Sequence, residues 1–273
     1  MKKILSVLMV LLLLISVGCK QQSQITSKSG LYSVKDATGT VVEFSEKPTK
    51  ILPLGTGIPE ILIDLVGPER IIAIPEYFED EKVSFIAEKA KNVRIKTQRV
   101  IPVESILKIK PDLVVAPYNS DITKIETMRS IGIKVVVVKP PHNMQEIEQC
   151  VLDVSKAVGE AEKGKQIVKN MQDIFSLIEK TNAKVPVAYR KTILALSVEG
   201  AFGVKGGLFD DLCHYACIKN AAGEIVLPSG ARISKEAVVE LQPDVILLPT
   251  ATRMMEDNKR KEAINNILHL SLI

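Results

Sequence analysis

The sequence predicts an α/β fold with two lobes that each hold a parallel sheet and are joined by one long helix. Three observations support this fold class. Short apolar runs of strand length alternate with amphipathic stretches of helical length in two regions of the chain. A long stretch without strand signals separates the two regions. A helix and strand pattern from the first region also recurs in the second at a constant offset.

The composition is that of a folded protein. The chain has 273 residues, of which 46% are hydrophobic and 25% charged, and these values exclude a wholly disordered, collagen-like or coiled-coil chain. The formal net charge of +4 does not indicate a nucleic-acid partner. With no Trp, 5 Tyr and 6 Phe, the chain also lacks the aromatic surface on which single-strand binders stack bases. We therefore expect no nucleic-acid partner.

Residues 1–18 have the pattern of a signal peptide, in which two lysines precede an apolar stretch over residues 4–17. That stretch would rise only about 21 Å as a helix, short of the roughly 30 Å hydrocarbon core, which favours a cleaved segment. Cys19 after Gly18 resembles the lipobox of bacterial lipoproteins, in which the cysteine is diacylated. The resemblance implies lipidation at Cys19, with residues 19–30 as a flexible tether. An ordinary signal peptide cleaved near Gly18 is the alternative.

The first lobe, residues 31–158, is predicted to begin with a hairpin over residues 31–44 that turns at Gly39. Buried-strand runs and helical stretches then alternate, which is typical of a parallel sheet covered on both faces. The predicted strands cover residues 50–54, 71–74, 113–116 and 135–138, and the predicted helices cover residues 59–66, 103–109 and 122–131.

The connecting helix is predicted within residues 159–183, after a break at Gly159. Over residues 160–181 it would be about 33 Å long. One apolar stripe recurs along it at spacings of three and four, formed by Gly164, Val168, Met171, Phe175 and Ile178. A new buried strand over residues 192–197 then opens the second lobe, residues 184–273. We expect the helix to act as a stiff spacer, so that the angle between the lobes changes little.

An internal repeat links the two lobes at an offset of 132 residues. Glu104, Pro111, Asp112 and Pro117 recur as Glu236, Pro243, Asp244 and Pro249. Each copy predicts a two-turn helix with the glutamate in its first turn, a stop at Pro-Asp and a short apolar strand that ends in proline. Two similar Rossmann-like lobes are therefore expected. After the second copy the sequence indicates one more helix, about residues 255–267, so we expect the second lobe to be incomplete.

Three further cysteines, an odd number, exclude a full disulfide framework. Cys213 and Cys217 are four residues apart on an expected helix, which suits a disulfide poorly, and with Cys150 they are expected to be buried thiols. Only three histidines occur, so we expect no metal site. No complete nucleotide motif and no Ser, His and Asp set indicates catalysis. We therefore expect neither an enzyme nor a cofactor.

Several segments resemble the solute-binding proteins of ABC importers for iron-siderophores, haem and cobalamin. They are residues 36–39 (DATG), 47–51 (KPTKI), 209–222 (FDDLCHYACIKNAA) and both copies of the repeat. The resemblance covers about residues 33–270, although Cys217 and Ile218 stand where such proteins often have glycine. It implies two α/β lobes joined by one helix, a small-molecule metal complex as ligand, and an ABC permease dimer with its ATPase subunits as partner. We expect the protein to be a monomer.

The resemblance gives Glu104 and Glu236 a role, because each would form a salt bridge with arginines of the permease dimer. The alternative is that each glutamate only favours the N-terminus of its helix through the dipole, which is worth about 0.3–1 kcal/mol.

The ligand is expected beyond the carboxyl ends of the strands, where open α/β sheets bind their ligands, so the candidate residues are on loops. The first-lobe candidates are Thr56, Gly57, Tyr77, Arg99, Tyr118, Asn119 and Lys139, and the second-lobe candidates are Glu199, Phe202, Lys205, Arg232, Thr252 and Arg253. The three arginines are candidates to pair with carboxylate or phosphate groups, with a solvated surface cation as the alternative for each. The two tyrosines are candidates to cover a planar ligand, or to pack at a domain edge.

We therefore expect an exported, lipid-anchored binding component on the outer face of the cell membrane, which captures an iron complex, haem or cobalamin. A zinc or manganese receptor of a related two-lobed class, an α/β enzyme and a truncated copy that binds nothing are the alternatives.

Overall fold

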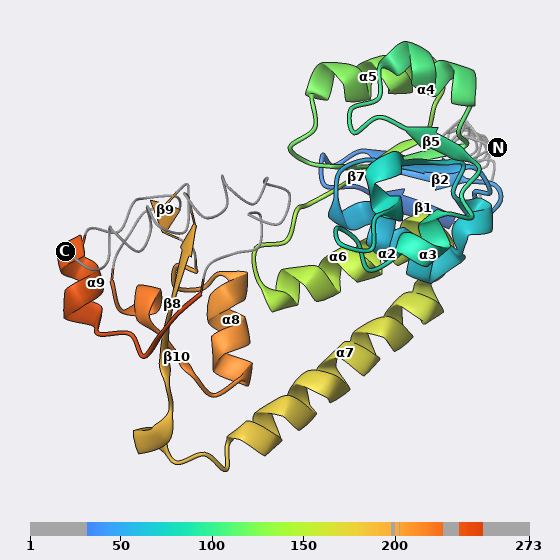
Figure 1. Cartoon of the computed structure of the whole chain (residues 1–273). Coiled ribbons are helices and arrows are strands. Elements are labelled where there is room, and N and C mark those ends of the chain that lie inside the picture. The colour runs from blue at the N-terminus through green and yellow to red at the C-terminus, as the bar shows by residue number, and fades with distance from the viewer. Residues whose placement is uncertain (1–31, 198–199, 202, 226–234, 248–273) are drawn as a thin grey trace, which may run out of the picture. The chain divides into compact units, whose positions relative to one another are not determined.

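A computed structural model describes residues 32–197, 200–201, 203–225 and 235–247 (Figure 1). The chain opens with the predicted hairpin. Strands β1 (Tyr32–Lys35) and β2 (Val41–Phe44) pair antiparallel, with Tyr32 opposite Phe44. Gly39 has φ +85°, a backbone conformation that L side chains rarely adopt, which explains why the turn falls there. The hairpin prediction is confirmed.

The first lobe holds parallel sheets, as the apolar runs predict. Strands β3 (Ile51–Pro53), β6 (Leu113–Pro117) and β7 (Val135–Val138) form one sheet in the order β3-β6-β7. Strands β4 (Ala73–Pro75) and β5 (Ile95–Thr97) form a second parallel pair, and a bridge between Ile51 and Ile71 links that pair to β3. Almost every residue of β3, β6 and β7 is buried, because helices cover both faces.

Alternate residues of each strand point to opposite faces, so the sheet divides the core of the lobe in two. The hairpin, α2 (Gly57–Val66), α3 (Ala87–Ala90) and α6 (Met144–Ala157) pack on the face that carries Ile51, Leu113 and Val136. Helices α4 (Val103–Ile109) and α5 (Ile122–Ser130) pack on the face that carries Leu52 and Val114. Figure 1 shows the two layers on either side of the strands. Short 3-10 turns occupy Pro68–Arg70 and Glu76–Glu79.

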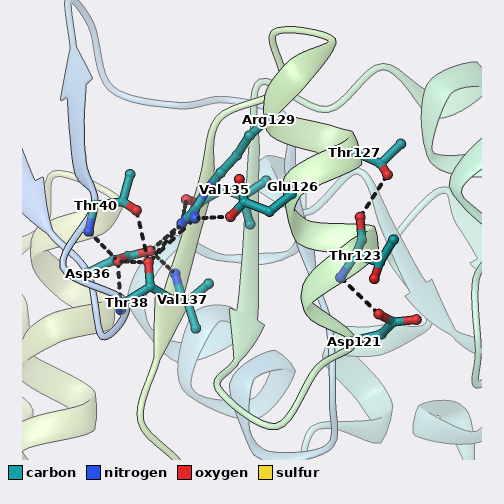
Figure 2. Close-up of polar contacts among 10 residues, drawn as sticks. All are labelled: Asp36, Thr38, Thr40, Asp121, Thr123, Glu126, Thr127, Arg129, Val135 and Val137. Atoms are coloured by element: carbon teal, nitrogen blue, oxygen red, sulfur yellow. Dashed lines mark hydrogen bonds and ion pairs between the residues drawn. The ribbon is translucent and has the colours of Figure 1, made fainter.

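A buried ion pair attaches the hairpin turn to the outer edge of β7 (Figure 2). Asp36 accepts hydrogen bonds from the Thr38 and Thr40 backbone N–H groups and from the Val137 N–H, and it pairs with the Arg129 guanidinium. The Ala37 N–H donates to the Val137 carbonyl at 2.8 Å. The turn therefore supplies the hydrogen bonds that an edge strand would otherwise leave unpaired. The DATG segment thus has a structural role.

The stretch between the two sheet regions, from residue 144 to residue 182, forms two helices with a break at Gly159, as predicted. Helix α6 ends at Ala157, Gly159 has φ +73°, and α7 covers Ala161–Asn182. Arg70 holds this junction, because its guanidinium donates to the Pro48 and Val158 carbonyls and pairs with Glu160 at 2.7 Å. No described helix has both the length and the apolar character needed to cross a membrane.

The apolar stripe of α7 is buried over only part of its length. Gly164 and Val168 are buried against α6, whereas Ile178 and its neighbours Ile174 and Leu177 are exposed. Phe175 instead contacts Tyr215, with ring centroids 4.7 Å apart. The apolar stripe that the spacing predicts is therefore buried only in its first part, because periodicity gives a face of the helix but does not say where along the helix a packing partner lies.

The second lobe begins at β8 (Thr192–Ser197), which has the predicted bounds, after a 3-10 turn at Val187–Tyr189. Strands β10 (Lys219–Asn220) and β11 (Val245–Leu247) flank β8 in parallel, and β9 (Gly200–Ala201) pairs with it antiparallel. Helix α8 covers Leu208–Tyr215, a 3-10 turn covers Ala221–Glu224, and α9 covers Lys235–Leu241. The expected helix over residues 255–267 lies outside the described residues.

Cys217 does not share a helix with Cys213, contrary to expectation. Helix α8 ends at Tyr215, and Cys217 has φ +54°. The Ile218 N–H reaches back to the Cys213 carbonyl at 3.0 Å, as in helix ends that place glycine in this conformation. Cys150 and Cys213 are buried, as expected, but Cys217 is only half-buried.

The internal repeat is present in the backbone. Helices α4 and α9 have bounds that differ by 132 residues, and each is followed by a residue with positive φ, Lys110 at +53° and Gln242 at +40°. The aspartate after each helix binds the start of the neighbouring strand: Asp112 accepts from the Lys50 N–H, and Asp244 from the Thr192 N–H. The Pro-Asp motif therefore closes the helix and fixes strand register in both lobes.

Candidate functional site

A cavity of about 710 Å³ lies in the first lobe, beyond the carboxyl ends of its strands. The loops that follow β3, β6 and β7 form much of its wall, and residues that follow β4 and β5 complete it. Among the sequence-predicted residues, the cavity is lined by Thr56, Gly57, Tyr77, Arg99, Asn119 and Lys139. Six of the seven first-lobe candidates are therefore brought together, because parallel strands place their carboxyl ends at one edge of a sheet.

The loop after β3 passes close to the end of β6. Gly55 has φ +82°, and a Cβ placed there would lie 3.1 Å from Pro117 Cγ. A larger residue would be strained and crowded at this point. Helix α2 begins two residues later, and its N-cap Thr56 makes no side-chain cap hydrogen bond. Gly57 and Ile58 of this first turn line the cavity, and the Thr56 side chain caps none of the backbone N–H groups of the turn.

The loop after β6 leads into α5, whose first turn also lines the cavity. Asp121 is the N-cap of this helix and accepts a hydrogen bond from the Thr123 N–H at 2.9 Å (Figure 2). Lys124 follows on the same turn and lines the cavity. Two helix N-termini therefore contribute to one wall, and each carries a partial positive charge from its dipole.

The polar rim of the cavity is mainly cationic. Arg99, Lys124 and Lys139 line it, and Asp121 supplies the one carboxylate among the described lining residues. Lys139 lies 3.5 Å from Glu146, but both side chains are partly exposed, so the pair neutralises the lysine only weakly. Burial raises the pKa of Tyr77, although the nearby Arg99 guanidinium opposes this shift. The Tyr77 hydroxyl is thus a neutral hydrogen-bonding group at neutral pH.

The floor of the cavity is apolar. It is formed by buried side chains from both sides of the strand ends, namely Ile58, Ile101, Ile106, Ile125, Met128 and Val138. Cys150 of α6 also reaches it, and burial, with Asp153 nearby, raises the pKa of its thiol to about 11. The thiol is therefore protonated and unreactive at neutral pH. An apolar floor below a cationic rim suits an amphiphilic anion.

Sequence reasoning missed several lining residues, notably Asp121, Lys124 and Met128. The signal that could have identified the first two is the helix start after β6, because the first turn of a helix that follows a parallel strand lies at the same edge as the strand end. Met128 is one turn further along and is buried. Only packing of α5 on the sheet brings it to the cavity.

The remaining candidates lie elsewhere. Tyr118 is exposed and lines a separate hollow with Asp36 and Val137. Lys205 is exposed on the loop before α8. Glu104 and Glu236 are both exposed, in the first turns of α4 and α9. The other candidates lie outside the described residues: Cys19, Glu199, Phe202, Arg232, Thr252 and Arg253. Among the described residues, no group of three or more His, Cys, Asp or Glu is arranged to hold a metal ion.

Comparison with known proteins gives a family match over most of the chain. A family model described as periplasmic binding protein matches residues 52–267. A search of curated proteins gives no significant match.

Solved structures of similar fold include bacterial solute-binding proteins. A possible iron-binding, periplasmic solute-binding protein from Staphylococcus epidermidis is 19% identical, with a TM-score of 0.61 over 74% of this chain and 78% of that chain. The iron uptake ABC transporter substrate-binding protein PiuA from Streptococcus pneumoniae is 17% identical, with a TM-score of 0.62 over 86% and 84%. The haem-binding protein RhuT from Roseiflexus is 20% identical, with a TM-score of 0.58 over 73% and 75%. At these identities the likeness is one of fold.

Proposed function

The chain belongs to the periplasmic binding protein family, and from this membership we propose that it is the substrate-binding protein of an ABC importer. It captures an iron complex, haem or cobalamin and delivers the ligand to a membrane permease, without making or breaking a bond. The functions of the iron-uptake and haem-binding neighbours support this choice of ligand class. The observation that carries the proposal is the cavity beyond the strand ends of the first lobe.

The cavity favours an anionic ligand. Its volume of about 710 Å³ lies within the roughly 300–1,000 Å³ of small-molecule sites. Arg99 and Lys124 have no ion-pair partner among the described residues and line the same rim. A carboxylate or another anionic oxygen on the ligand would gain charge-assisted hydrogen bonds from them, each worth about 1.5–3 kcal/mol. The second-lobe candidates Lys205, Arg232 and Arg253 would add further cations.

The protein acts outside the cytoplasm, as family membership implies. We propose in addition that Cys19 carries the lipid that anchors it to the outer face of the membrane, as the signal sequence and lipobox-like pattern indicate. Intact mass measurement of the protein extracted from membranes tests this point, since a diacylated Cys19 adds the mass of its lipid and an ordinary cleaved terminus does not.

We propose that Glu104 and Glu236 dock the protein on the permease. Both side chains are exposed in the first turn of equivalent helices. A pair of matched acidic groups suits a dimeric partner that presents a cation at each of two equivalent places.

The experiment is a binding titration of residues 19–273 with haem, a ferric siderophore and cobalamin. We expect saturable binding of one of them. For an anionic ligand, Arg99→Ala and Lys124→Ala should each weaken binding roughly 10-fold or more, the loss of one charge-assisted hydrogen bond.

Arg94→Ala is the matched control, because exposed Arg94 precedes β5 whereas Arg99 follows it at the cavity end. Failure of all three ligands to bind would contradict the proposed function. If Arg99→Ala and Arg94→Ala change the ligand affinity equally, the cationic rim does not have the proposed role in binding.

A further inference from the structure

The outward faces of helices α4 and α9 have the same pattern of exposure. The positions 104, 107, 108 and 110 of the first copy are exposed, and so are positions 236, 239, 240 and 242 of the second, 132 residues later. In each helix a central residue, Ile106 or Val238, is buried, and partly buried neighbours such as Ile109 or Leu241 pack on the same core. The two helices therefore present equivalent surfaces to solvent.

Each surface carries an aliphatic side chain one turn after its glutamate. Leu107 is 43% exposed and Val239 is 66% exposed. Residues three apart on a helix are neighbours on its surface, so each aliphatic group lies beside the glutamate of the same copy. Single exposed aliphatic residues are common and need no explanation. An aliphatic group that occupies the same exposed place beside a glutamate in both copies is a more specific observation.

Duplication alone does not account for this match, because the neighbouring exposed positions differ between the copies. Lys108 corresponds to Glu240, and Lys110 corresponds to Gln242. The charges on the outward face therefore differ between the two copies, whereas both copies have the glutamate and an aliphatic residue three positions after it. Helix stability does not explain Val239 either, because β-branched residues are weaker helix formers than Lys, Glu or Gln.

We infer that Leu107 and Val239 are contact residues for the permease, each of which inserts into an apolar recess beside the cation that pairs with Glu104 or Glu236. This inference rests on the proposed function and extends it from charge pairing to an apolar contact at each docking point. The equivalence of the two faces suits a partner with two equivalent docking places, as the dimeric permease of the proposed function would have. In such an interface the buried aliphatic group contributes to the lifetime of the complex, whereas the exposed charges mainly steer association.

The test measures binding of residues 19–273 to the purified permease and ATPase complex in nanodiscs at two salt concentrations. Glu104→Gln or Glu236→Gln should lower affinity and flatten the salt dependence. Leu107→Gln and Val239→Gln should each lower affinity roughly five- to tenfold, which corresponds to the loss of a buried contact worth about 1–1.4 kcal/mol, with the salt dependence unchanged.

Ile174→Gln is the matched control, because Ile174 is a β-branched residue that is 58% exposed on a different helix, α7. Its affinity for the permease complex should stay within about twofold of the unchanged protein. Ligand binding and the melting temperature should remain the same in all variants.

The outcomes separate the inference from its premise. If the unchanged protein does not bind the permease complex at all, the proposed function and the inference are both overturned. If it binds, and the glutamate variants lose affinity while Leu107→Gln and Val239→Gln behave like Ile174→Gln, only the inference is overturned.

Discussion

At the scale of single residues, the ion pair between Asp36 and Arg129 holds the hairpin turn on the sheet. The Asp36 side chain is 0% exposed and that of Arg129 is 15% exposed. Asp36 joins residues about a hundred positions apart, because it also accepts from the Val137 N–H at 3.0 Å. Removing one member of such a pair leaves a buried charge without its partner, which costs far more than losing a surface pair.

Asp36→Asn should therefore lower the free energy of unfolding by about 3 kcal/mol, since the amide keeps the volume but loses the charge. Urea denaturation at neutral pH measures this change. Glu126→Gln is the control, because Glu126 pairs with the same Arg129 from an exposed position, and it should change stability by less than about 0.5 kcal/mol. Equal effects of the two substitutions would show that burial does not govern the strength of this cluster.

Cys217 is a residue whose backbone conformation suits glycine. Its φ of +54° costs an L residue about 1–2 kcal/mol. Glycine avoids this cost, but it has more conformational freedom in the unfolded chain, so the net gain in stability from a glycine is smaller than the cost removed. Cys217→Gly should raise the free energy of unfolding by about 0.5–1 kcal/mol. Cys217→Ala removes the thiol but keeps the strain, so it should give no such gain. Thermal and urea unfolding of the unchanged protein and the two variants measure these differences. If Cys217→Ala were as stabilising as Cys217→Gly, the positive φ would not be the source of the gain.

At the scale of elements, the crossing of α6 and α7 depends on a glycine. A Cβ at Gly164 would lie 2.1 Å from Ser155 Oγ and 2.4 Å from Ser155 Cβ. Rotation of the serine cannot relieve the second overlap, because the Cβ position is fixed by the backbone. The two helices can approach this closely only because one of the facing residues has no side chain.

Gly164→Ala should therefore lower the free energy of unfolding by about 1–2 kcal/mol, although alanine is the better helix former by about 1 kcal/mol. In a Ser155→Gly background the same change should become neutral or stabilising, because the overlap is gone. A double-mutant cycle measured by urea denaturation gives the coupling. Additive effects of the two substitutions would contradict the close approach.

At the scale of the whole molecule, α7 connects the two sheet regions along the chain, and we propose that it acts as a stiff spacer. Its 22 residues correspond to about 33 Å of helix. Its start is fixed by Arg70 and Glu160, and Phe175 near its other end contacts Tyr215 of α8. A helix held near both ends resists bending more than a loop does, which favours a small change of lobe angle over a wide hinge motion.

Small-angle scattering of residues 19–273 with and without bound ligand should therefore give nearly the same radius of gyration. The ligand is whichever of haem, ferric siderophore or cobalamin saturates the protein in titration. A large fall in the radius on binding would show that the lobes close around a hinge and that α7 is not a rigid spacer.

Local periodicity made much of the fold predictable. The alternation of apolar residues identified the hairpin, and continuous apolar runs identified β3, β6, β7 and β8. The proline and aspartate of the repeat identified α4 and α9 with their true ends. For the site, the sequence could predict only lining residues on the loops that follow strands. Lys124 and Met128 were missed because they reach the cavity from a helix rather than a loop.

The sequence by itself determined the hairpin, the buried strands β3, β6, β7 and β8, the duplicated helix and strand unit, and the edge of the sheet at which the cavity lies. These features depend on residues that are close together in the chain. The tertiary structure alone decided that Asp36 pairs with Arg129, that the stripe on α7 is buried only near α6, and that a cationic rim surrounds an apolar floor. Those features depend on how separate elements pack, and local pattern carries no information about the distance between residues on different elements.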